Sequence, residues 1–167
     1  MLDTGPFPRY FRGMNLSDYT IDHGFLPRLD CGDVEATVAK LVERLAREGE
    51  VESPDELVQE VMRRENEGST AIGGGLVIPH ARFPGVRRVR IAVATLAEAL
   101  HISSEDGHPV DIVILLVGPQ NDPRQMLRVL ARLARLVRQD EYLNGLRQAQ
   151  TSDLLQAAFA RAGEISY

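Results

Sequence analysis

The chain has no tryptophan, one cysteine and few aromatic side chains, which make up 5% of its 167 residues. Base stacking and carbohydrate platforms both depend on aromatic rings, so their scarcity argues against either kind of binding site. The lone cysteine, Cys31, excludes an internal disulfide and a metal site built from cysteines. We expect it to be a small buried apolar side chain.

Charge and hydropathy exclude two further kinds of partner. The formal net charge of −5 gives no electrostatic basis for DNA or RNA as the main partner. No apolar run approaches the roughly 18 residues that cross a bilayer, and the N-terminus lacks the apolar segment of a secretory signal. The sequence therefore predicts a cytoplasmic protein that does not insert into a membrane.

The composition that remains is that of one globular domain. The chain is 44% hydrophobic, and its length fits a single domain with a proper core. Residues 1–13 combine proline, glycine and aromatic residues without any periodicity. We therefore predict an N-terminal tail over residues 1–13 and a domain over residues 14–167.

Helical periodicity appears in two parts of the chain. A first helix is predicted after Cys31, with Gly49 as its C-terminal cap. The run Ser53-Pro54-Asp55-Glu56 has the N-cap, first-turn proline and glutamate of a capping box, so it predicts a second helix that ends before Gly68. From Asp122 onward, three further segments have the apolar spacing of helices.

Strand patterns lie between these helices. The sequence predicts strands at residues 76–78, 89–96 and 110–118. The last run is apolar at every position after Asp111, which is typical of a central strand that is covered on both faces. Strands between flanking helices predict an α/β domain with helices on both faces of the sheet.

The segment STAIGGGLVIPHAR places His80 just beyond three glycines and a short apolar run. A histidine there has four candidate roles: metal ligand, general base, phosphate acceptor or structural residue. The other histidines show no metal-ligand spacing to it, and no GxSxG motif supplies a hydrolase nucleophile. Spacing alone leaves the structural and the phosphate-accepting roles open.

The residues around His80 favour phosphate. Glycines such as Gly73 and Gly75 can adopt positive φ and turn their N–H groups toward an anion. Ser69 and Thr70 add hydroxyl donors, and the guanidinium of Arg64 could grip phosphate oxygens in a bidentate manner. A neutral imidazole is a competent nucleophile near neutral pH. Such glycine loops also serve as plain turns.

The same segment resembles the phosphorylation-site motif of the fructose/mannitol-type enzyme IIA domains of the bacterial phosphotransferase system, a family that includes nitrogen-regulatory proteins. That motif reads roughly Thr-Gly-Ile-Gly-x-Gly-Ile-Ala-Ile-Pro-His-Gly. The matching residues are Thr70, Ile72, Gly73, Gly75, Ile78, Pro79 and His80. The segments RREN, EDGHPVDIVILLVGP, LARLARLV and YLNGLRQAQTSDLL extend the similarity over roughly residues 16–159.

This resemblance implies a mixed β-sheet sandwiched between helices, with His80 as the phosphorylated residue and Arg64 as the arginine that steadies the phosphoryl group. It implies an HPr-type phosphocarrier as donor and an enzyme IIB, or a regulated target protein, as partner. It implies no cofactor and no metal. If the site is active, the chain is a phosphotransferase that carries phosphohistidine.

The chain departs from the family where a second histidine often begins the helix after the last strand. Met126 stands at that position in the segment MLRVL, and methionine cannot donate a hydrogen bond to phosphate. Three functions therefore stay open: a phosphocarrier, a regulator read through the state of His80, and an IIA-like binding module without phosphoryl transfer. Met126 favours regulation.

Overall fold

The computed structural model describes residues 14–136 and 138–164. The tail predicted for residues 1–13 lies outside the described residues. The strands are β1 (Thr20–Leu29), β2 (Ala71–Gly73), β3 (Leu76–Val77), β4 (His80–Phe83), β5 (Arg90–Leu100) and β6 (Val110–Pro119). The helices are α1 (Val34–Arg47), α2 (Pro54–Glu67), α3 (Pro123–Leu136), α4 (Asp140–Gln148) and α5 (Ser152–Ala160), with short 3-10 turns at Leu16–Tyr19 and Arg161–Glu164.

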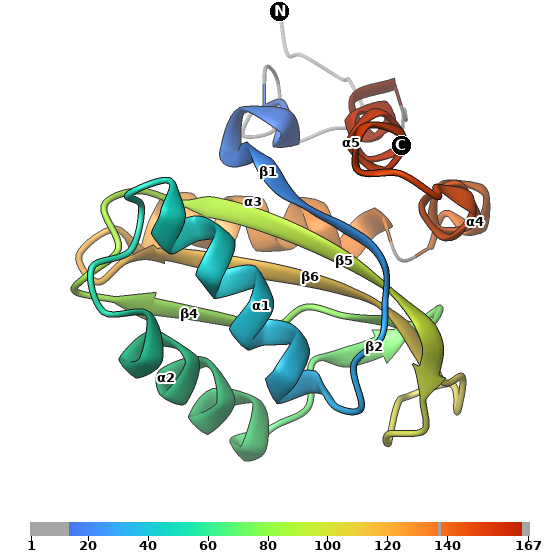
Figure 1. The fold of residues 1–167 in the computed structure, drawn as a ribbon, viewed down its shortest axis with the longest axis horizontal. Helices are drawn as coiled ribbons and strands as arrows, with labels where there is room; N and C mark the ends of the chain where they lie inside the picture. Colours follow the sequence, from blue (N-terminus) through green and yellow to red (C-terminus); the bar gives the residue numbers. More distant parts are fainter. Residues whose placement is uncertain (1–13, 137, 165–167) are drawn as a thin grey trace, which may run out of the picture.

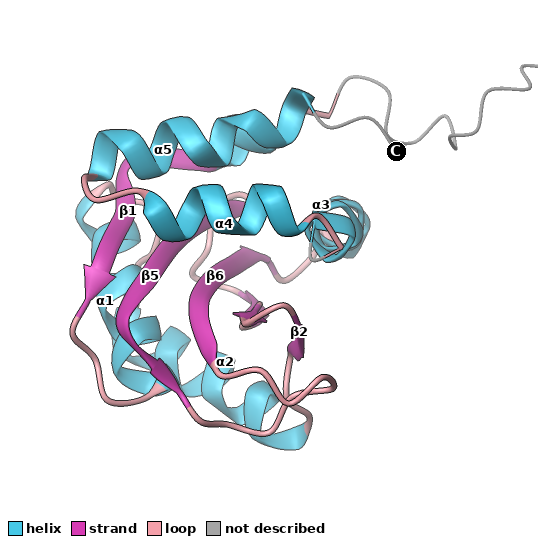
Figure 2. Cartoon of the chain, turned by 90° about the vertical axis from the view of Figure 1, so that its right-hand side faces the viewer, coloured by secondary structure: helices cyan, strands magenta, loops and turns pink. Residues whose placement is uncertain are grey.

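The strands form one mixed sheet in the order β1-β5-β6-β3-β2, and β4 also pairs with β6. β5 and β6 are antiparallel, while β3 and β4 both run parallel to β6 on its other side. Helices α1 and α2 cover one face of the sheet, and α3, α4 and α5 cover the other (Figures 1 and 2). The predicted mixed sheet between helices is confirmed.

Two apolar cores follow from the alternation of side chains along β5 and β6. Ile91, Val93 and Leu116 pack on the side of α3, α4 and α5. Ala92 and Leu115 pack on the side of α1 and α2. The residues of β6 from Ile112 to Val117 are fully buried because both faces of the strand are covered.

The helix ends match their sequence signals with one exception. The Asp33 side chain accepts a hydrogen bond from Ala36 N–H and caps α1, and Gly49 follows that helix with a φ of 75°. The start of α2 at Pro54 agrees with the predicted capping box, but the Ser53 side chain makes no capping hydrogen bond. That part of the prediction is wrong.

Three strands, β1, β2 and β4, were not predicted from the sequence, and β2 lies where only a glycine loop was expected. β1 contains Gly24 and Pro27, and its exposed residues Asp22, His23 and Arg28 do not alternate with buried ones, so it shows no strand pattern. Its pairing with β5 is interrupted by register shifts. β4 is too short to produce a pattern, and His80 begins this strand rather than following one.

Two further features concern Cys31 and the character of the helices. Cys31 is half-buried rather than buried, and it packs against the core on the side of α1 and α2. Among the helices of the described ranges, none combines the length and the apolar character that a membrane span requires.

Candidate functional site

His80 is held in a defined orientation at the start of β4. Its half-buried ring places Nδ1 at 2.8 Å from the carbonyl oxygen of Ile78. A carbonyl oxygen can only accept, so Nδ1 is the donor, and the neutral ring carries its lone pair on Nε2. The structure therefore leaves Nε2 as the ring nitrogen of His80 with a free lone pair.

The backbone on both sides of His80 is tied to β6. The carbonyl of Pro79 accepts a hydrogen bond from Leu116 N–H at 3.0 Å, and His80 pairs with Leu116 in the parallel ladder. Ala81 is fully buried toward α1 and α2, so the alternation of a strand directs His80 to the opposite face, where α3 lies. The ring is thus fixed by the sheet as well as by its own hydrogen bond.

The three glycines form a tight hairpin between β2 and β3. Their φ angles are 111° at Gly73, 67° at Gly74 and 76° at Gly75. Positive φ at both central residues of a two-residue connection is the requirement of a type I′ turn, which glycine meets without strain. The Gly-Gly pair between apolar residues was a hairpin signal that the sequence analysis did not use.

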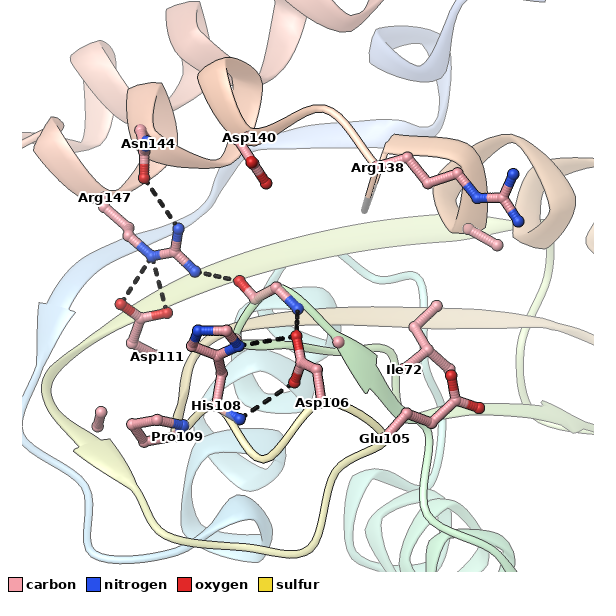
Figure 3. Close-up of a pocket in the computed structure, with 15 residues that line it drawn as sticks. Ile72, Glu105, Asp106, His108, Pro109, Asp111, Arg138, Asp140, Asn144 and Arg147 are labelled. Atoms are coloured by element: carbon pink, nitrogen blue, oxygen red, sulfur yellow. Dashed lines mark hydrogen bonds and ion pairs between the residues drawn. The ribbon is translucent and has the colours of Figure 1, made fainter.

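The hairpin is held by side chains from two distant parts of the chain. The N–H of Gly74 donates to the Asp106 carboxylate at 2.8 Å, and the carbonyl of Gly74 accepts from Arg147. Figure 3 shows these contacts converging on the glycine backbone. The N–H of Gly74 is therefore already satisfied, and the phosphate-binding roles of Gly73 and Gly75 stay predictions.

Asp106 is the acceptor of several hydrogen bonds in the loop before β6. The backbone N–H of Gly74, the backbone N–H of His108 and the His108 ring hold the pKa of the Asp106 carboxyl well below its usual range. All of these bonds favour the ionised carboxylate. In the sequence, Asp106-Gly107 has the pattern of a turn and gives no sign of this role, because the partner Gly74 lies far away in the chain.

The two hydroxyl residues upstream of the hairpin also have protein partners. Thr70 donates its N–H to Glu65 at 2.9 Å and its hydroxyl to the other oxygen of the same carboxylate at 2.6 Å. Ser69 accepts a hydrogen bond from Ala71 N–H at 3.2 Å. If Thr70 is to bind phosphate, its hydroxyl must leave Glu65, so the roles of Ser69 and Thr70 remain predictions.

Arg64 lies in the last turn of α2 with its side chain 40% exposed. Its Nε is 3.4 Å from Glu60, which is a long contact for a charged pair. Glu60 also pairs with Arg63, whose hydrogen bond is the largest cause that lowers the pKa of the Glu60 carboxyl. Among the described residues, no hydrogen bond joins Arg64 to His80, so its role at the phosphoryl group stays a prediction.

Met126 is 5% exposed on the core face of α3. It belongs to the same apolar cluster as Ile78 and Leu116, the residues that bond to or pair with His80. Met126 therefore packs as a core residue in the neighbourhood of the histidine. In this placement Met126 fills part of the core, and its effect on transfer stays a prediction.

A cavity of about 990 Å³ lies between the hairpin, the loop before β6, and helices α3 and α4. Its wall includes Gly73–Gly75, Asp106, His108, Asp111, Arg138 and Arg147 (Figure 3). His80, Arg64 and Met126 are not among the described residues that line it. In the part of the chain that the structure describes, no three histidine, cysteine or acidic side chains gather as metal ligands would.

Comparisons with known proteins identify the chain's relatives. It is 36% identical over 131 residues to the 2-O-alpha-mannosyl-D-glycerate-specific EIIABC component of Escherichia coli, which covers 77% of this chain and 20% of that protein. It is 30% identical over 149 residues to a nitrogen regulatory protein of Bradyrhizobium diazoefficiens, which covers 88% of this chain and 95% of that protein.

A solved structure and a family model point to the same group of proteins as these relatives. The crystal structure of nitrogen regulatory protein IIA-Ntr from Neisseria meningitidis has a TM-score of 0.77 and 24% identity, and covers 86% of this chain and 97% of that one. The model of the family described as phosphoenolpyruvate-dependent sugar phosphotransferase system, EIIA 2, matches residues 21–162. The resemblance found in the motif around His80 is confirmed, and the chain belongs to this EIIA 2 family.

Proposed function

We propose that the chain accepts a phosphoryl group on Nε2 of His80 from an HPr-type phosphocarrier protein. The observation that carries this proposal is the hydrogen bond from Nδ1 of His80 to the Ile78 carbonyl, on a motif of the EIIA 2 family. This hydrogen bond leaves the lone pair of the ring on Nε2. The ring is only half-buried, so part of the ring is accessible to a donor protein.

The transfer needs no cofactor. The Nε2 lone pair attacks the phosphorus of a phosphohistidine on the donor, the bond between phosphorus and the donor nitrogen breaks, and its electron pair stays on the donor ring. The His80 ring gains positive charge as the new bond forms. Because Nδ1–H points at the Ile78 carbonyl, that charge is stabilised by a hydrogen bond that already exists.

Arg64 is the cation we assign to the phosphoryl oxygens. Its side chain is partly exposed and loosely held by Glu60, so it can reorient when a charged group arrives. Phosphoryl transfer depends mainly on positioning and charge stabilisation, which a guanidinium supplies.

Two uses of the phosphorylated protein follow from the family. As a carrier, the protein passes the phosphoryl group to an enzyme IIB. As a regulator in the cytoplasm, it binds a target protein according to the state of His80. The second use is favoured by Met126, because a core residue occupies the position where many relatives have a second histidine, and the site has no second imidazole from that position to assist onward transfer. An IIA-like module that binds a target without any phosphoryl transfer is the alternative.

Incubation with phosphoenolpyruvate, enzyme I and an HPr-type protein, followed by intact-mass measurement, tests the proposal. We expect one acid-labile phosphoryl group on the wild type and none on His80→Ala. The matched control is His101→Ala, which changes an exposed histidine and should be labelled like the wild type. Labelling that persists in His80→Ala, or a wild type that takes no phosphate, would refute the assignment.

A second step separates the two uses. The phosphorylated protein is mixed with an enzyme IIB, and the loss of its phosphoryl group is followed by mass. Rapid loss supports a carrier. A phosphoryl group that stays on His80 when the enzyme IIB is added, but returns readily when the HPr-type donor is added, supports a regulator.

A further inference from the structure

We propose that Arg147 is a positioning residue for phosphoryl transfer at His80, acting through the β2–β3 hairpin and the register of β3 and β4 along β6. This inference rests on the proposed function. Arg147 touches neither His80 nor the reacting atoms, and it acts by fixing the segment that leads to the histidine.

Arg147 holds three parts of the structure at once. Its Nε lies 2.8 and 3.0 Å from the two oxygens of Asp111, the second residue of β6. Its Nη1 donates to Asn144 at 3.0 Å, and its Nη2 donates to the carbonyl of Gly74 (Figure 3). The rigid planar fork of a guanidinium makes these contacts simultaneously, so hairpin, β6 and α4 are joined at one side chain.

The hairpin is built to fit against this arginine. A Cβ on Gly75 would lie 2.6 Å from Nη2 of Arg147 and 2.8 Å from the Asp111 carboxylate. Only a residue without a side chain lets the backbone approach so closely, and the φ of 76° makes the same demand. The side chains of Arg147 and Asp111 are only 29% and 26% exposed, so water screens their attraction less than it would at the surface.

We call the contacts of Arg147 with Asp111 and Gly74 the clamp. β6 connects this clamp to His80. The carbonyl of Gly75 accepts hydrogen bonds from Asp111 N–H at 3.0 Å and Ile112 N–H at 3.1 Å. From there β3 pairs with β6 at Ile112 and Val113, and β4 pairs with it from Leu116. The clamp at Asp111 thus fixes the point where the segment from Gly75 to His80 begins its run along β6.

Loosening the clamp should therefore misplace the His80 ring relative to a docked donor. A small misplacement of a reacting group lowers the rate of the chemical step strongly, while leaving the docking surface of the partner unchanged. The expected signature is a lower maximal rate at saturating donor with little change in the donor concentration that gives half of that rate.

The test compares Arg147→Ala and Arg147→Lys with Arg47→Ala, an exposed arginine of α1 that pairs with Glu43. Single-turnover phosphorylation is measured against the concentration of the phosphorylated HPr-type donor, well below each variant's unfolding temperature. We expect the maximal rate of Arg147→Ala to fall about tenfold and its half-saturating concentration to stay within about twofold. Arg147→Lys should recover only part of the rate because an ammonium group cannot make the forked contacts.

Two kinetic outcomes overturn the inference. An Arg147→Ala protein that melts earlier but keeps the wild-type maximal rate would make Arg147 purely structural. A raised half-saturating concentration at an unchanged maximal rate would make it a docking residue. If Arg147→Ala does not fold, the same criteria apply to Arg147→Lys and to Asp111→Asn.

An NMR readout separates this inference from the proposed function. The amide signals of Gly74 and Gly75 and the titration of the His80 imidazole are recorded for the wild type and Arg147→Lys. Shifts in both the hairpin amides and the His80 titration support positioning, even if the wild type takes no phosphate and the proposed function fails. Hairpin shifts with an unaltered His80 titration, or no shifts at all, overturn it.

Discussion

At the scale of single residues, the ring of His80 donates a hydrogen bond from Nδ1 to the carbonyl of Ile78. This bond decides the tautomer, and the tautomer decides which nitrogen can attack phosphorus. The carbonyl belongs to the backbone, so no side-chain substitution at Ile78 removes it. The selection of Nε2 is therefore a property of the chain path around Pro79.

Arg64→Ala should slow phosphorylation of His80 about tenfold to a hundredfold, because a charge-assisted hydrogen bond to phosphate is worth about 1.5–3 kcal/mol. Thermal stability should hardly change, since the side chain is 40% exposed and its contact with Glu60 is long. The phosphorylation rate of each variant is measured by following its intact mass over time. Arg63→Ala, on the same helix and also paired with Glu60, is the control and should keep the wild-type rate. Equal rates for the Arg64 and Arg63 variants would place Arg64 outside the site.

Met126→His should lower the free energy of unfolding by about 1–3 kcal/mol, because it buries an imidazole without a built partner in an apolar core. Met126→Leu should cost less than about 1.5 kcal/mol. Denaturant unfolding measures both. We expect no faster return of phosphate from His80 to the donor. A faster return at unaltered stability would contradict this and show that residue 126 faces the phosphoryl group.

The sequence could single out His80 as a candidate, because the glycines, Pro79 and the rest of the family motif lie beside it in the chain. It could not show that Asp106, Asp111 and Arg147 hold the glycine hairpin, since these residues approach Gly74 and Gly75 only in the folded sheet. Contacts between distant residues leave no periodic signal.

At the scale of elements, the hairpin shows why the replacement of two of its glycines should be costly. A Cβ on Gly73 would lie 3.1 Å from the Asp106 carboxylate, and one on Gly75 would collide with the Arg147 guanidinium. The glycines therefore have a packing role, whether or not their N–H groups also bind phosphate. In this hairpin, the conformational freedom of glycine and its small size are both needed.

Gly75→Ala should lower the free energy of unfolding by at least about 2 kcal/mol, because it adds a collision to the strain of a left-handed residue. Two controls separate these causes. Gly107 has a φ of 72° but open space around it, so Gly107→Ala adds strain without a collision and should cost about 1 kcal/mol. Gly68 has neither a positive φ nor a close neighbour, so Gly68→Ala should change stability by less than about 0.5 kcal/mol. Equal losses for Gly75→Ala and Gly107→Ala, measured by denaturant unfolding, would show that Arg147 yields without cost.

The helices were more predictable than the strands. An amphipathic helix repeats its apolar face over many residues, so α1 and α2 stand out in the sequence. β6 stands out as a continuous apolar run because both of its faces are covered. β1 lacks alternation, and its residues are held in the sheet by pairing with β5 and by packing against α5, which are tertiary effects.

At the scale of the whole molecule, β6 organises the site. It pairs with β5 on one side and with both β3 and β4 on the other, so it links the glycine hairpin to His80. Its first residues bind the hairpin through Asp111, and its later residues pair with β4. Changes at one end of β6 can therefore reach the other end through the register of the sheet.

The ionisation of Asp106 should make the stability of the molecule depend on pH. Its pKa is lower in the folded state than in the unfolded state, so its contribution is complete above the ordinary carboxyl pKa of about 3.9 and is lost as the pH falls through the lower folded-state value. Denaturant unfolding of the wild type and Asp106→Asn measures this. The stability difference between them should shrink as the pH falls below about 4. A difference that stays constant would show that Asp106 is not the titrating group.

The most direct test of the function assigned to His80 is an NMR measurement on protein with ¹⁵N-labelled histidine, phosphorylated by phosphoenolpyruvate, enzyme I and an HPr-type protein. The ring nitrogens of His80 are assigned before and after phosphorylation, and the nitrogen coupled to phosphorus is identified. We predict that phosphorus is bonded to Nε2 and that Nδ1 keeps its proton toward the Ile78 carbonyl. Phosphorus on Nδ1, on another histidine, or on no histidine would contradict the proposed function.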